Sequence, residues 1–434
     1  MAGKAYENCL AAMYGLRRFG IKLGLETIRH ILSQLGDPQL NFRAIHIAGT
    51  NGKGSVAAML STILHAAGYR VGRYTSPHLE RFNERICINN APIADADVLD
   101  GYKRVAGIKH LDRQPTFFEF ATAMALDQFG RKKVDWAVIE TGMGGRLDAT
   151  NVLKPDLSII TNISLEHKEY LGNTIAAIAR EKAGIIKPKV PLVTGVRQPS
   201  ARRVVFEQVR KTKASAFLMG SDFRHRRQAN GAFNYYGMAK TYRNLKLNLA
   251  GEHQIGNAAL ALAACETLVK TAFVEIPEQS IVRALAETSW PGRLEVVRHC
   301  PEVILDGAHN LMAARALAHH LRTRYANRRI TMVIGILDDK PSEAILKDLA
   351  SACRRMVVTQ PKIDRANSAE RLSVLAKSHL ADVTTIGDVA LAVRHALDTS
   401  NADDVICIAG SLYVVGEAQT ALRELVNRPK SPNA

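Results

Sequence analysis

The first half of the chain alternates short apolar runs with longer segments in which apolar residues recur at helical spacing. The runs that we expect to form strands cover residues 44–48, 70–74, 136–140, 157–161 and 191–195. Several of them are nearly continuous apolar runs, which is typical of parallel strands covered by helices on both faces. The pattern therefore predicts an α/β fold built on a mostly parallel sheet.

This alternation is interrupted once before it restarts. Residues 215–250 consist of short segments separated by turn signals at 230–231 and 236–237, which predict a small antiparallel hairpin insert. A helix rich in Ala and Leu follows over residues 257–270. The Trp-Pro-Gly turn at 290–292 ends the helical stretch and marks a domain boundary.

We expect two domains, residues 1–289 and 290–434. Strands in the second domain are predicted at 303–305, 330–334, 356–359, 383–386 and 405–409, with helices between them. This alternation predicts a Rossmann-like α/β domain. The domain lacks a G-x-G-x-x-G segment, so we do not expect a dinucleotide site there.

Residues 45–55, IHIAGTNGKGS, join a predicted strand to a predicted helix through a glycine-rich turn. Gly49, Gly52 and Gly54 allow the backbone to approach a ligand closely. The N–H groups and the dipole at the start of the helix favour anionic oxygens. The segment is therefore predicted to bind the phosphates of a nucleotide.

Two side chains of this turn suit the same ligand, because Lys53 can reach the β and γ phosphates and the Ser55 hydroxyl suits Mg²⁺. The segment is not a standard P-loop, since Ile47 replaces the first glycine and Gly54 separates Lys53 from Ser55. The alternative is a glycine-rich strand-to-helix turn with a chance lysine.

Three further polar side chains lie at or after the ends of predicted strands: Glu140 ends the strand 136–140, and Ser76 and His167 lie in the segments after the strands 70–74 and 157–161. Ligands of open α/β sheets bind at the carboxyl ends of the strands, so these groups are predicted to form a Mg²⁺ site beside the phosphates. The alternatives are an acidic strand cap for Glu140 and a structural histidine for His167.

The net charge of +17 favours anionic ligands such as a nucleotide or a polycarboxylate. The densest basic stretch, residues 202–227, has no recognisable nucleic-acid module beside it, so we interpret it as a solvated face and expect no nucleic-acid partner. The histidine pair at 319–320 is expected to face solvent.

Six scattered cysteines without a C-x-x-C pair indicate a reducing, cytoplasmic location. No run is long enough for a membrane helix, so no membrane partner is expected.

Eleven short segments, in order along the chain, resemble the folylpolyglutamate synthase/dihydrofolate synthase family, a branch of the ATP-dependent ligases that includes the muramyl amino-acid ligases. They are FGIKLGLETI (19–28), AGTNGKGS (48–55), TSPHLERFNERI (75–86), TFFE (116–119), ETGMGGRLDATN (140–151), NISLEHKEYLG (162–172), EKAGIIK (181–187), GEHQIGNAALA (251–261), WPGRLE (290–295), DGAHN (306–310) and GSLYVVGE (410–417).

The resemblance implies an ATP site and a magnesium site. The residues matching ATP contacts are Gly49, Thr50, Asn51, Gly52, Lys53, Gly54, Ser55, Asn257, Arg293 and Asp306. Those matching ligands of Mg²⁺, for which two ions are expected, are Ser55, Ser76, Glu140, His167 and Lys182, the last as a carbamylated side chain. Without the resemblance, Lys182 would be interpreted as a surface lysine of a helix. Glu166 departs slightly from the family pattern, in which we expect Asp, and is not one of the ligands.

The resemblance also implies positions for the other substrates. His309 and Ser411 resemble residues that line the glutamate side of the site. The pterin pocket would be lined by Leu23, Gly24, Leu25, Thr116, Phe117, Phe118, Glu119, Leu147, Asp148 and Ala149. The structural alternatives are a core position for Phe118 and a helix cap for Asp306. Lys53, Lys182, Arg293 and His309 are the expected catalytic residues.

The expected activity is therefore ATP-dependent amide ligation, in which a carboxylate is phosphorylated and the amine of L-glutamate attacks the acyl phosphate. The acceptor is expected to be dihydropteroate, a reduced folate or both, and the enzyme is expected to be a monomer. Three alternatives remain: a muramyl-type ligase, a P-loop kinase or GTPase, and a P-loop nucleic-acid-binding ATPase.

Overall fold

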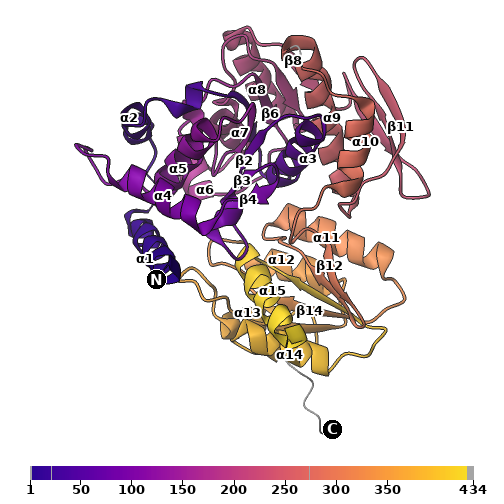
Figure 1. The fold of residues 1–434 in the computed structure, drawn as a ribbon. Coiled ribbons are helices and arrows are strands. Elements are labelled where there is room, and N and C mark those ends of the chain that lie inside the picture. Colours follow the sequence, from indigo (N-terminus) through magenta and orange to yellow (C-terminus); the bar gives the residue numbers. More distant parts are fainter. Residues whose placement is uncertain (1, 21, 273, 428–434) are drawn as a thin grey trace. The chain divides into compact units, whose positions relative to one another are not determined.

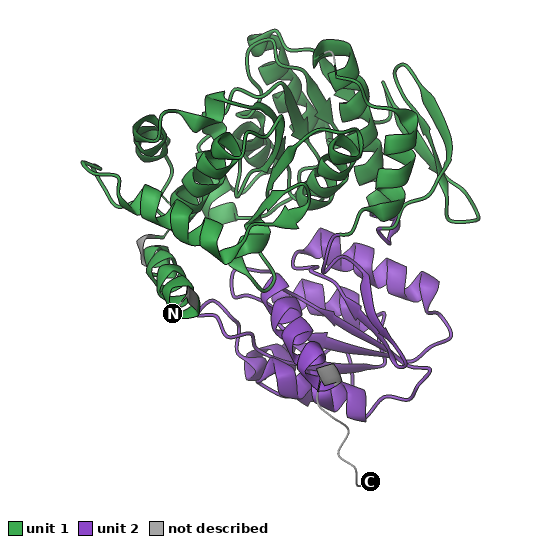
Figure 2. Cartoon of the chain, viewed as in Figure 1, with its two compact units in different colours: residues 1–248, 254–289 green, residues 249–253, 290–434 purple. Residues whose placement is uncertain are grey.

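The computed structural model describes residues 2–20, 22–272 and 274–427 (Figure 1). The chain divides into two compact units (Figure 2). Unit 1 consists of Met1–Asn248 and Gln254–Ser289, and unit 2 consists of Leu249–His253 and Trp290–Ala434. Within the described residues, no helix combines the length and the apolar character that crossing a membrane requires.

Unit 1 is built on a sheet with the strand order β4-β3-β2-β5-β1-β6-β7-β8. The strands are β1 (Arg43–Ala48), β2 (Val71–Tyr74), β3 (Ile86–Ile88), β4 (Ala91–Pro92), β5 (Trp136–Glu140), β6 (Leu157–Ile160), β7 (Leu192–Thr194) and β8 (Ala216–Leu218). From β2 to β8 the neighbours are parallel, and β3 and β4 extend one edge as antiparallel strands. The predicted α/β class and mostly parallel sheet are confirmed.

The helices of unit 1 cover this sheet (Figure 1). They are α1 (Ala2–Gly15), α2 (Glu26–Gln34), α3 (Lys53–Ala66), α4 (Asp95–Ala106), α5 (Phe117–Arg131), α6 (Lys168–Leu171), α7 (Ile175–Ala183), α8 (Pro199–Thr212), α9 (Glu252–Ala272) and α10 (Glu278–Glu287). One apolar core includes buried residues of α1, α2, α4 and α5, and another includes residues of α7 and α8. Because β1, β5 and β6 are buried along almost their whole length, their carboxyl ends are fixed in position.

The antiparallel insert is smaller than the sequence predicts. Residues 216–218 form β8, which pairs in parallel with β7 in the main sheet. The insert itself consists of β9 (Arg224–Arg227), β10 (Phe233–Tyr236) and β11 (Thr241–Leu245), with β10 in the middle. The prediction of an insert over 215–250 is therefore wrong at its start, where the apolar segment Ala216–Leu218 extends the parallel sheet instead.

Unit 2 contains a sheet with the order β12-β13-β17-β14-β15-β16. The strands are β12 (Glu295–His299), β13 (Glu302–Leu305), β14 (Ile330–Ile334), β15 (Arg355–Val358), β16 (Val383–Thr385) and β17 (Val405–Ala409). The helices are α11 (Leu311–Arg324), α12 (Ser342–Ala350), α13 (Ala369–Lys377), α14 (Val389–Asp398) and α15 (Leu412–Asn427). The strands from β13 to β16 are parallel, and β12 adds an antiparallel edge that the sequence did not predict.

Candidate active site

The glycine-rich turn between β1 and α3 has a conformation that requires two of its glycines. Gly49 has φ 151° and Gly52 has φ 86°. A Cβ atom at position 49 would lie 1.9 Å from Thr161 Oγ1, and one at position 52 would lie 2.4 Å from Asn257 Oδ1. Both positions therefore combine positive φ with a close approach of neighbouring side chains.

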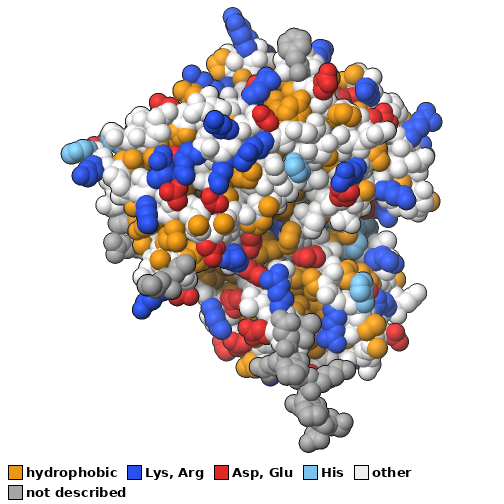
Figure 3. Space-filling model, viewed as in Figure 1, with side chains coloured by type: hydrophobic (Ala, Val, Ile, Leu, Met, Phe, Trp, Pro, Cys, Tyr) orange, Lys and Arg blue, Asp and Glu red, His pale blue; other side chains and the backbone are white. Residues whose placement is uncertain are grey.

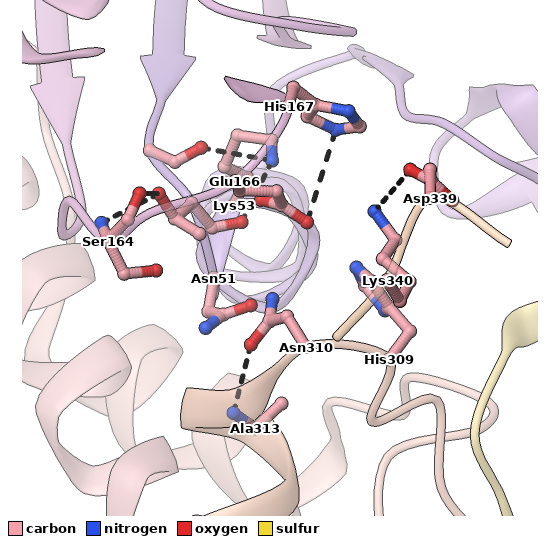
Figure 4. A network of polar contacts seen from close by, with 12 residues as sticks. Asn51, Lys53, Ser164, Glu166, His167, His309, Asn310, Ala313, Asp339 and Lys340 are labelled. Atoms are coloured by element: carbon pink, nitrogen blue, oxygen red, sulfur yellow. Dashed lines mark hydrogen bonds and ion pairs between the residues drawn. The ribbon is translucent and has the colours of Figure 1, made fainter. Parts of the chain in front are cut away.

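The segment after β6 holds this turn in place. The backbone N–H of Thr50 donates to the Asn162 carbonyl at 2.9 Å, and that of Asn51 donates to Asn162 Oδ1 at 3.0 Å. Thr161 Oγ1 donates to the Asn51 carbonyl at 2.7 Å. The Ser164 N–H donates to Thr50 Oγ1 at 3.0 Å (Figure 4). The turn is therefore preorganised before any ligand binds.

Thr161 and Asn162 were not predicted to belong to the site. Their position directly after a buried strand, on the sheet edge that carries the turn, was the available signal. Because the first N–H groups of α3 have no acceptor within the helix, the fixed turn presents them to an anionic ligand.

Lys53 and Glu140 lie together at this edge of the sheet. Lys53 Nζ donates to the carbonyl oxygens of Gly49, at 3.1 Å, and Thr50, at 3.2 Å, and lies 3.7 Å from Glu140 Oε1. Glu140 Oε2 accepts from the backbone N–H of Ser76 at 3.1 Å. The structure thus brings Ser76 and Glu140 together, with the Glu140 carboxylate buried beside a cation.

Lys182 is buried, so the interpretation as a surface lysine is wrong. Its exposed fraction is 4%, and its Nζ donates to the Gly49 carbonyl at 2.8 Å. On α7 it lies four residues after Ile178 and three after Ala179, which are both fully buried, so it belongs to the apolar face of the helix. Burial, followed by the charge of Lys53, lowers the pKa of Lys182 to about 7.

His167 and Glu166 follow β6 and precede α6. Glu166 Oε1 lies 4.0 Å from His167 Nε2, and the two side chains are drawn together with Lys53 in Figure 4. The Glu166 carboxylate also raises the pKa of Lys182, against the larger effect of burial. Glu166, which the sequence analysis set aside, therefore belongs electrostatically to the site.

This region offers several side chains that could act as ligands of Mg²⁺. Glu140 offers a buried carboxylate, Ser55 a buried hydroxyl and His167 an imidazole, and Thr141 Oγ1, beside Glu140, is buried with no hydrogen-bond partner in the described part of the chain. No group of three or more His, Cys, Asp or Glu side chains among the described residues has the arrangement of a metal site. Mg²⁺ commonly takes few protein ligands and completes its shell with water and phosphate oxygens, so the residues present fit it.

In unit 2, the DGAHN segment (306–310) connects the end of β13 to the start of α11. Asp306 accepts from the backbone N–H of Leu294 and of Ala308, both at 2.9 Å. Arg293 Nη1 donates to the Gly292 carbonyl at 2.9 Å. The interpretation of Asp306 as a helix cap is wrong, because Asn310 caps α11 by accepting from the Ala313 N–H at 3.0 Å (Figure 4).

His309 and Ser411 also have defined local partners in unit 2. His309 Nδ1 lies 2.8 Å from the Gly307 carbonyl, so Nδ1 is the donor of this hydrogen bond. Ser411 is buried, and its Oγ accepts from the Val414 N–H at 3.1 Å at the start of α15.

Several of the expected pterin-side residues of unit 1 have defined hydrogen bonds or packing contacts within the unit. Thr116 and Glu119 form a capping box at the start of α5, and Arg113 donates to both oxygens of Glu119 at 2.7 and 2.9 Å. The Phe118 ring packs against Gly142, where a Cβ would meet the ring at 2.5 Å, and its centroid lies 6.0 Å from that of Tyr74.

The solvent exposure of the remaining pterin-side residues ranges from that of an exposed side chain to that of a buried one. Leu23 is 48% exposed, whereas Leu25 and Ala149 are buried. The Phe117 ring lies 5.6 Å from that of Tyr14. Asp148 is buried and accepts from the Met143 N–H at 2.8 Å, and burial raises the pKa of its carboxyl.

Comparison with known proteins gives the class of this molecule first. Residues 47–265 match the Mur ligase middle domain, and residues 292–412 match the Mur ligase glutamate ligase domain. The fold and the matched domains define an ATP-dependent ligase that forms C–N bonds.

The relatives that match over nearly the whole chain give the family. The dihydrofolate synthase/folylpolyglutamate synthase of Bacillus subtilis is 36% identical over 430 residues, covering 96% of this chain and 99% of the relative. The folylpolyglutamate synthase of Lacticaseibacillus casei is 34% identical, with 96% and 98% covered. The chain belongs to the folylpolyglutamate synthase/dihydrofolate synthase family, as the sequence analysis predicts.

Solved structures agree with this assignment. Escherichia coli FolC in complex with DHPP and ADP has a TM-score of 0.88 at 30% identity, covering 96% of this chain and 98% of that chain. The folylpolyglutamate synthase of Thermotoga maritima has a TM-score of 0.85 at 38% identity, with 98% of each chain covered. The bifunctional enzyme from Yersinia pestis, complexed with AMPPNP and Mn ion, has a TM-score of 0.86 at 31% identity, with 96% and 98% covered. The muramyl-type alternative is not favoured.

Proposed function

We propose that the enzyme uses ATP to add L-glutamate to dihydropteroate and to the γ-carboxylate of a reduced folate. The observation that carries this proposal is the convergence of two lysine side chains on one carbonyl oxygen: Lys53 Nζ and Lys182 Nζ lie 3.1 and 2.8 Å from the oxygen of Gly49. The two amines lie at the start of α3 beside the buried Glu140, where Lys53 supplies a cation for a ligand with concentrated negative charge.

The chemistry requires an activated carboxylate, because a free carboxylate is a poor acyl donor. The acceptor carboxylate attacks the γ-phosphorus of ATP, giving an acyl phosphate and ADP. The amine of L-glutamate then attacks the acyl carbon, and inorganic phosphate leaves as the amide forms. Lys53 would neutralise charge that develops on the transferred phosphoryl group.

The proposal assigns roles to both units. Unit 1 would act as the ATP-binding domain through residues 49–55 and Asn257, with the pterin-side residues on the same unit. Unit 2 would contribute Arg293 and Asp306 toward ATP and His309 and Ser411 toward glutamate. The hydrogen bond from Nδ1 to the Gly307 carbonyl would orient the His309 ring on the glutamate side.

Magnesium would be held by Ser55, Ser76, Glu140, His167 and Lys182, and would supply charge neutralisation for the phosphates. We further propose two ions and a carbamylated Lys182. A carbamate forms when a neutral amine adds CO₂ and releases one proton, which converts a cation into an oxygen ligand. A buried lysine with a pKa of about 7 has a substantial neutral fraction for this reaction.

We also propose that the enzyme acts as a monomer in the cytoplasm, where its six cysteines, all free, would stay reduced.

The test is an assay of phosphate release with ATP, Mg²⁺, L-glutamate and either dihydropteroate or tetrahydrofolate, with mass analysis of the product. We expect both acceptors to gain one glutamate per phosphate released. If only one acceptor gains glutamate, the enzyme has that activity alone and the proposal is wrong for the other acceptor. Turnover with neither acceptor would contradict the proposed function.

A further inference from the structure

The antiparallel sheet of β9, β10 and β11 lies in the most basic part of the chain. Between residues 197 and 246 the sequence has twelve Lys or Arg and two Asp or Glu, so this segment supplies +10 of the net charge of +17. The strands and turns over residues 224–245 contain no Asp or Glu at all. In Figure 3, Lys and Arg side chains are visible along the margin of unit 1 where Figure 1 draws β11. Such a field attracts ligands that carry many negative charges.

The two faces of this sheet differ sharply. The inner face is largely apolar, since Phe233, Tyr235, Tyr242 and Leu245 are buried there. It also carries His225 and the exposed Arg227, opposite Tyr235 and Phe233. The outer face bears the exposed Arg224, Arg226 and Arg243 together with Asn234 and Tyr236. The register places Arg226 opposite Asn234 and Arg224 opposite Tyr236 on neighbouring strands. The outer face therefore presents guanidinium groups together with one aromatic ring and one amide.

This surface is fixed to the body of unit 1 by Glu266 of α9. The Glu266 carboxylate accepts from Tyr235 Oη at 2.8 Å and from the backbone N–H groups of Met238, Ala239 and Lys240 at 2.9, 3.2 and 2.8 Å. These bonds clamp the turn between β10 and β11. The basic face is thus a rigid platform rather than a flexible basic tail.

The arginines of the platform are available for a ligand. In the described structure Arg224, Arg226 and Arg243 form no ion pair with a carboxylate. The Arg224 guanidinium lies 4.9 Å from the centroid of the half-buried Tyr236 ring. An arginine stacked on a tyrosine offers planar groups on which a base can stack, and the other guanidinium groups suit paired hydrogen bonds to phosphate oxygens.

We propose that the outer face of this sheet binds single-stranded nucleic acid, with phosphates on Arg226 and Arg243 and a base on Tyr236 and Arg224. A membrane surface fits less well, because none of the large hydrophobic side chains that are exposed lies between residues 197 and 246. The proposal departs from the expectation of a solvated face without a nucleic-acid partner. It does not depend on the ligase function, since none of these residues belongs to the candidate active site.

The first test measures the binding of fluorescent 12-nucleotide oligouridylate and oligothymidylate to the full chain by anisotropy at several salt concentrations. We expect the Arg224→Gln/Arg226→Gln/Arg243→Gln variant to bind at least tenfold more weakly. The slope of log affinity against log salt should become about 1.4 smaller in magnitude, because two phosphate contacts are lost. The matched control is Arg354→Gln/Arg371→Gln/Arg394→Gln, which removes the same charge from exposed positions of unit 2. An equal loss in both variants would overturn the proposal.

The second test separates nucleic acid from other polyanions. Tyr236→Ala should weaken oligonucleotide binding severalfold, and Tyr236→Phe, which keeps the ring, should not. A 12-residue polyglutamate peptide and vesicles containing phosphatidylglycerol serve as competing probes. The proposal is overturned if Tyr236→Ala binds normally, or if either competitor binds as tightly as the oligonucleotides and depends on the same arginines. An unchanged melting temperature and phosphate-release rate in each variant would show that the fold is intact.

Discussion

Lys182 illustrates how a single residue can reveal a functional site. A lysine ammonium loses its hydration when buried, and this position is only 4% exposed with one carbonyl oxygen as its hydrogen-bond partner in the structure. The shift of its pKa to about 7 expresses that cost. Lys53 lies close enough to lower the pKa further. Placing two lysine amines this close together destabilises the fold. We therefore attribute the arrangement to the binding and chemistry of a ligand.

We predict that Lys182 carries a carbamate. With ¹³C-bicarbonate, the native enzyme should show a carbamate carbon signal that disappears on acidification, because carbamates decarboxylate when protonated. Lys182→Ala should lose the signal and at least a hundredfold in turnover, and acetate should restore part of the rate. Lys211→Ala, at an exposed position of α8, is the control and should keep both. A carbamate signal that survives in Lys182→Ala would contradict the assignment.

His46 gives a second prediction at the residue scale. It is fully buried on β1, and its Nε2 lies 2.8 Å from Thr150 Oγ1, which donates to Asp148. His46 Nε2 is therefore the donor, and its Nδ1 has no hydrogen-bond partner in the described residues. Burial, followed by the charge of Lys187, lowers the pKa of His46 to about 3, from 6.5 in an exposed chain.

Between pH 6.5 and pH 3 the unfolded chain thus binds more protons at His46 than the native state does. Protonation of His46 in the unfolded chain therefore lowers the free energy of unfolding. The free energy of unfolding is not reduced in this way above pH 6.5, and it decreases as the pH falls from 6.5 toward 3. From pH 7 to pH 5 the loss is about 2 kcal/mol. Urea unfolding should show this loss in the native protein and in the control His319→Gln, and a smaller loss in His46→Gln. Identical pH dependence in all three would exclude the buried histidine as the cause.

At the scale of elements, the turn between β1 and α3 depends on packing as well as on backbone freedom. Gly52 has φ 86° and borders Asn257, whereas Gly36 has φ 82° and open space where a Cβ would stand. Gly52→Ala and Gly36→Ala should each lose about 1–2 kcal/mol from the left-handed conformation. Gly52→Ala should in addition lose ATP binding, because its Cβ would displace Asn257 and the start of α3. Titration calorimetry with ATP distinguishes the two variants, and equal ATP affinity would contradict the role of the turn.

The elements that the sequence predicts best are those whose pattern is set by burial on both faces. The strands β5, β14 and β17 coincide with their predicted ranges because their apolar runs are nearly continuous. The edge strands β3, β4 and β12 were missed, since such strands are short or carry polar residues and take their partners from distant segments. The apolar segment of β8 was assigned to the insert because sequence pattern does not specify the pairing partner.

The candidate site divides in the same way. The strand-end positions of Glu140, Ser76 and His167 follow from local pattern, because the ends of parallel strands share one edge. The hydrogen bonds of Asn162 to the turn join residues 111 positions apart in sequence, which no local pattern contains. The burial of Lys182 could have been inferred from its spacing to Ile178 and Ala179, but its acceptor Gly49 lies 133 positions away.

At the scale of the whole molecule, the proposed reaction divides its work between two units. The phosphate-binding turn belongs to unit 1, and Arg293 and Asp306 belong to unit 2. Arg293 is held by the Gly292 carbonyl, and a Cβ at position 307 would lie 2.2 Å from its Nη1. A guanidinium constrained in this way is suited to act on charge that develops during transfer rather than to bind ATP in the ground state.

We therefore predict that Arg293→Ala lowers turnover about a hundredfold while the dissociation constant for ATP rises no more than threefold. An interaction made only in the transition state affects the rate and leaves ground-state binding nearly unchanged. Arg298→Ala, on the exposed strand β12 five residues later, is the control and should change neither quantity. The two measurements are ATP titration of the full chain and phosphate release at saturating substrates. If Arg293→Ala keeps normal turnover, unit 2 does not supply this charge; if ATP affinity falls as much as turnover, Arg293 contributes to ground-state binding instead.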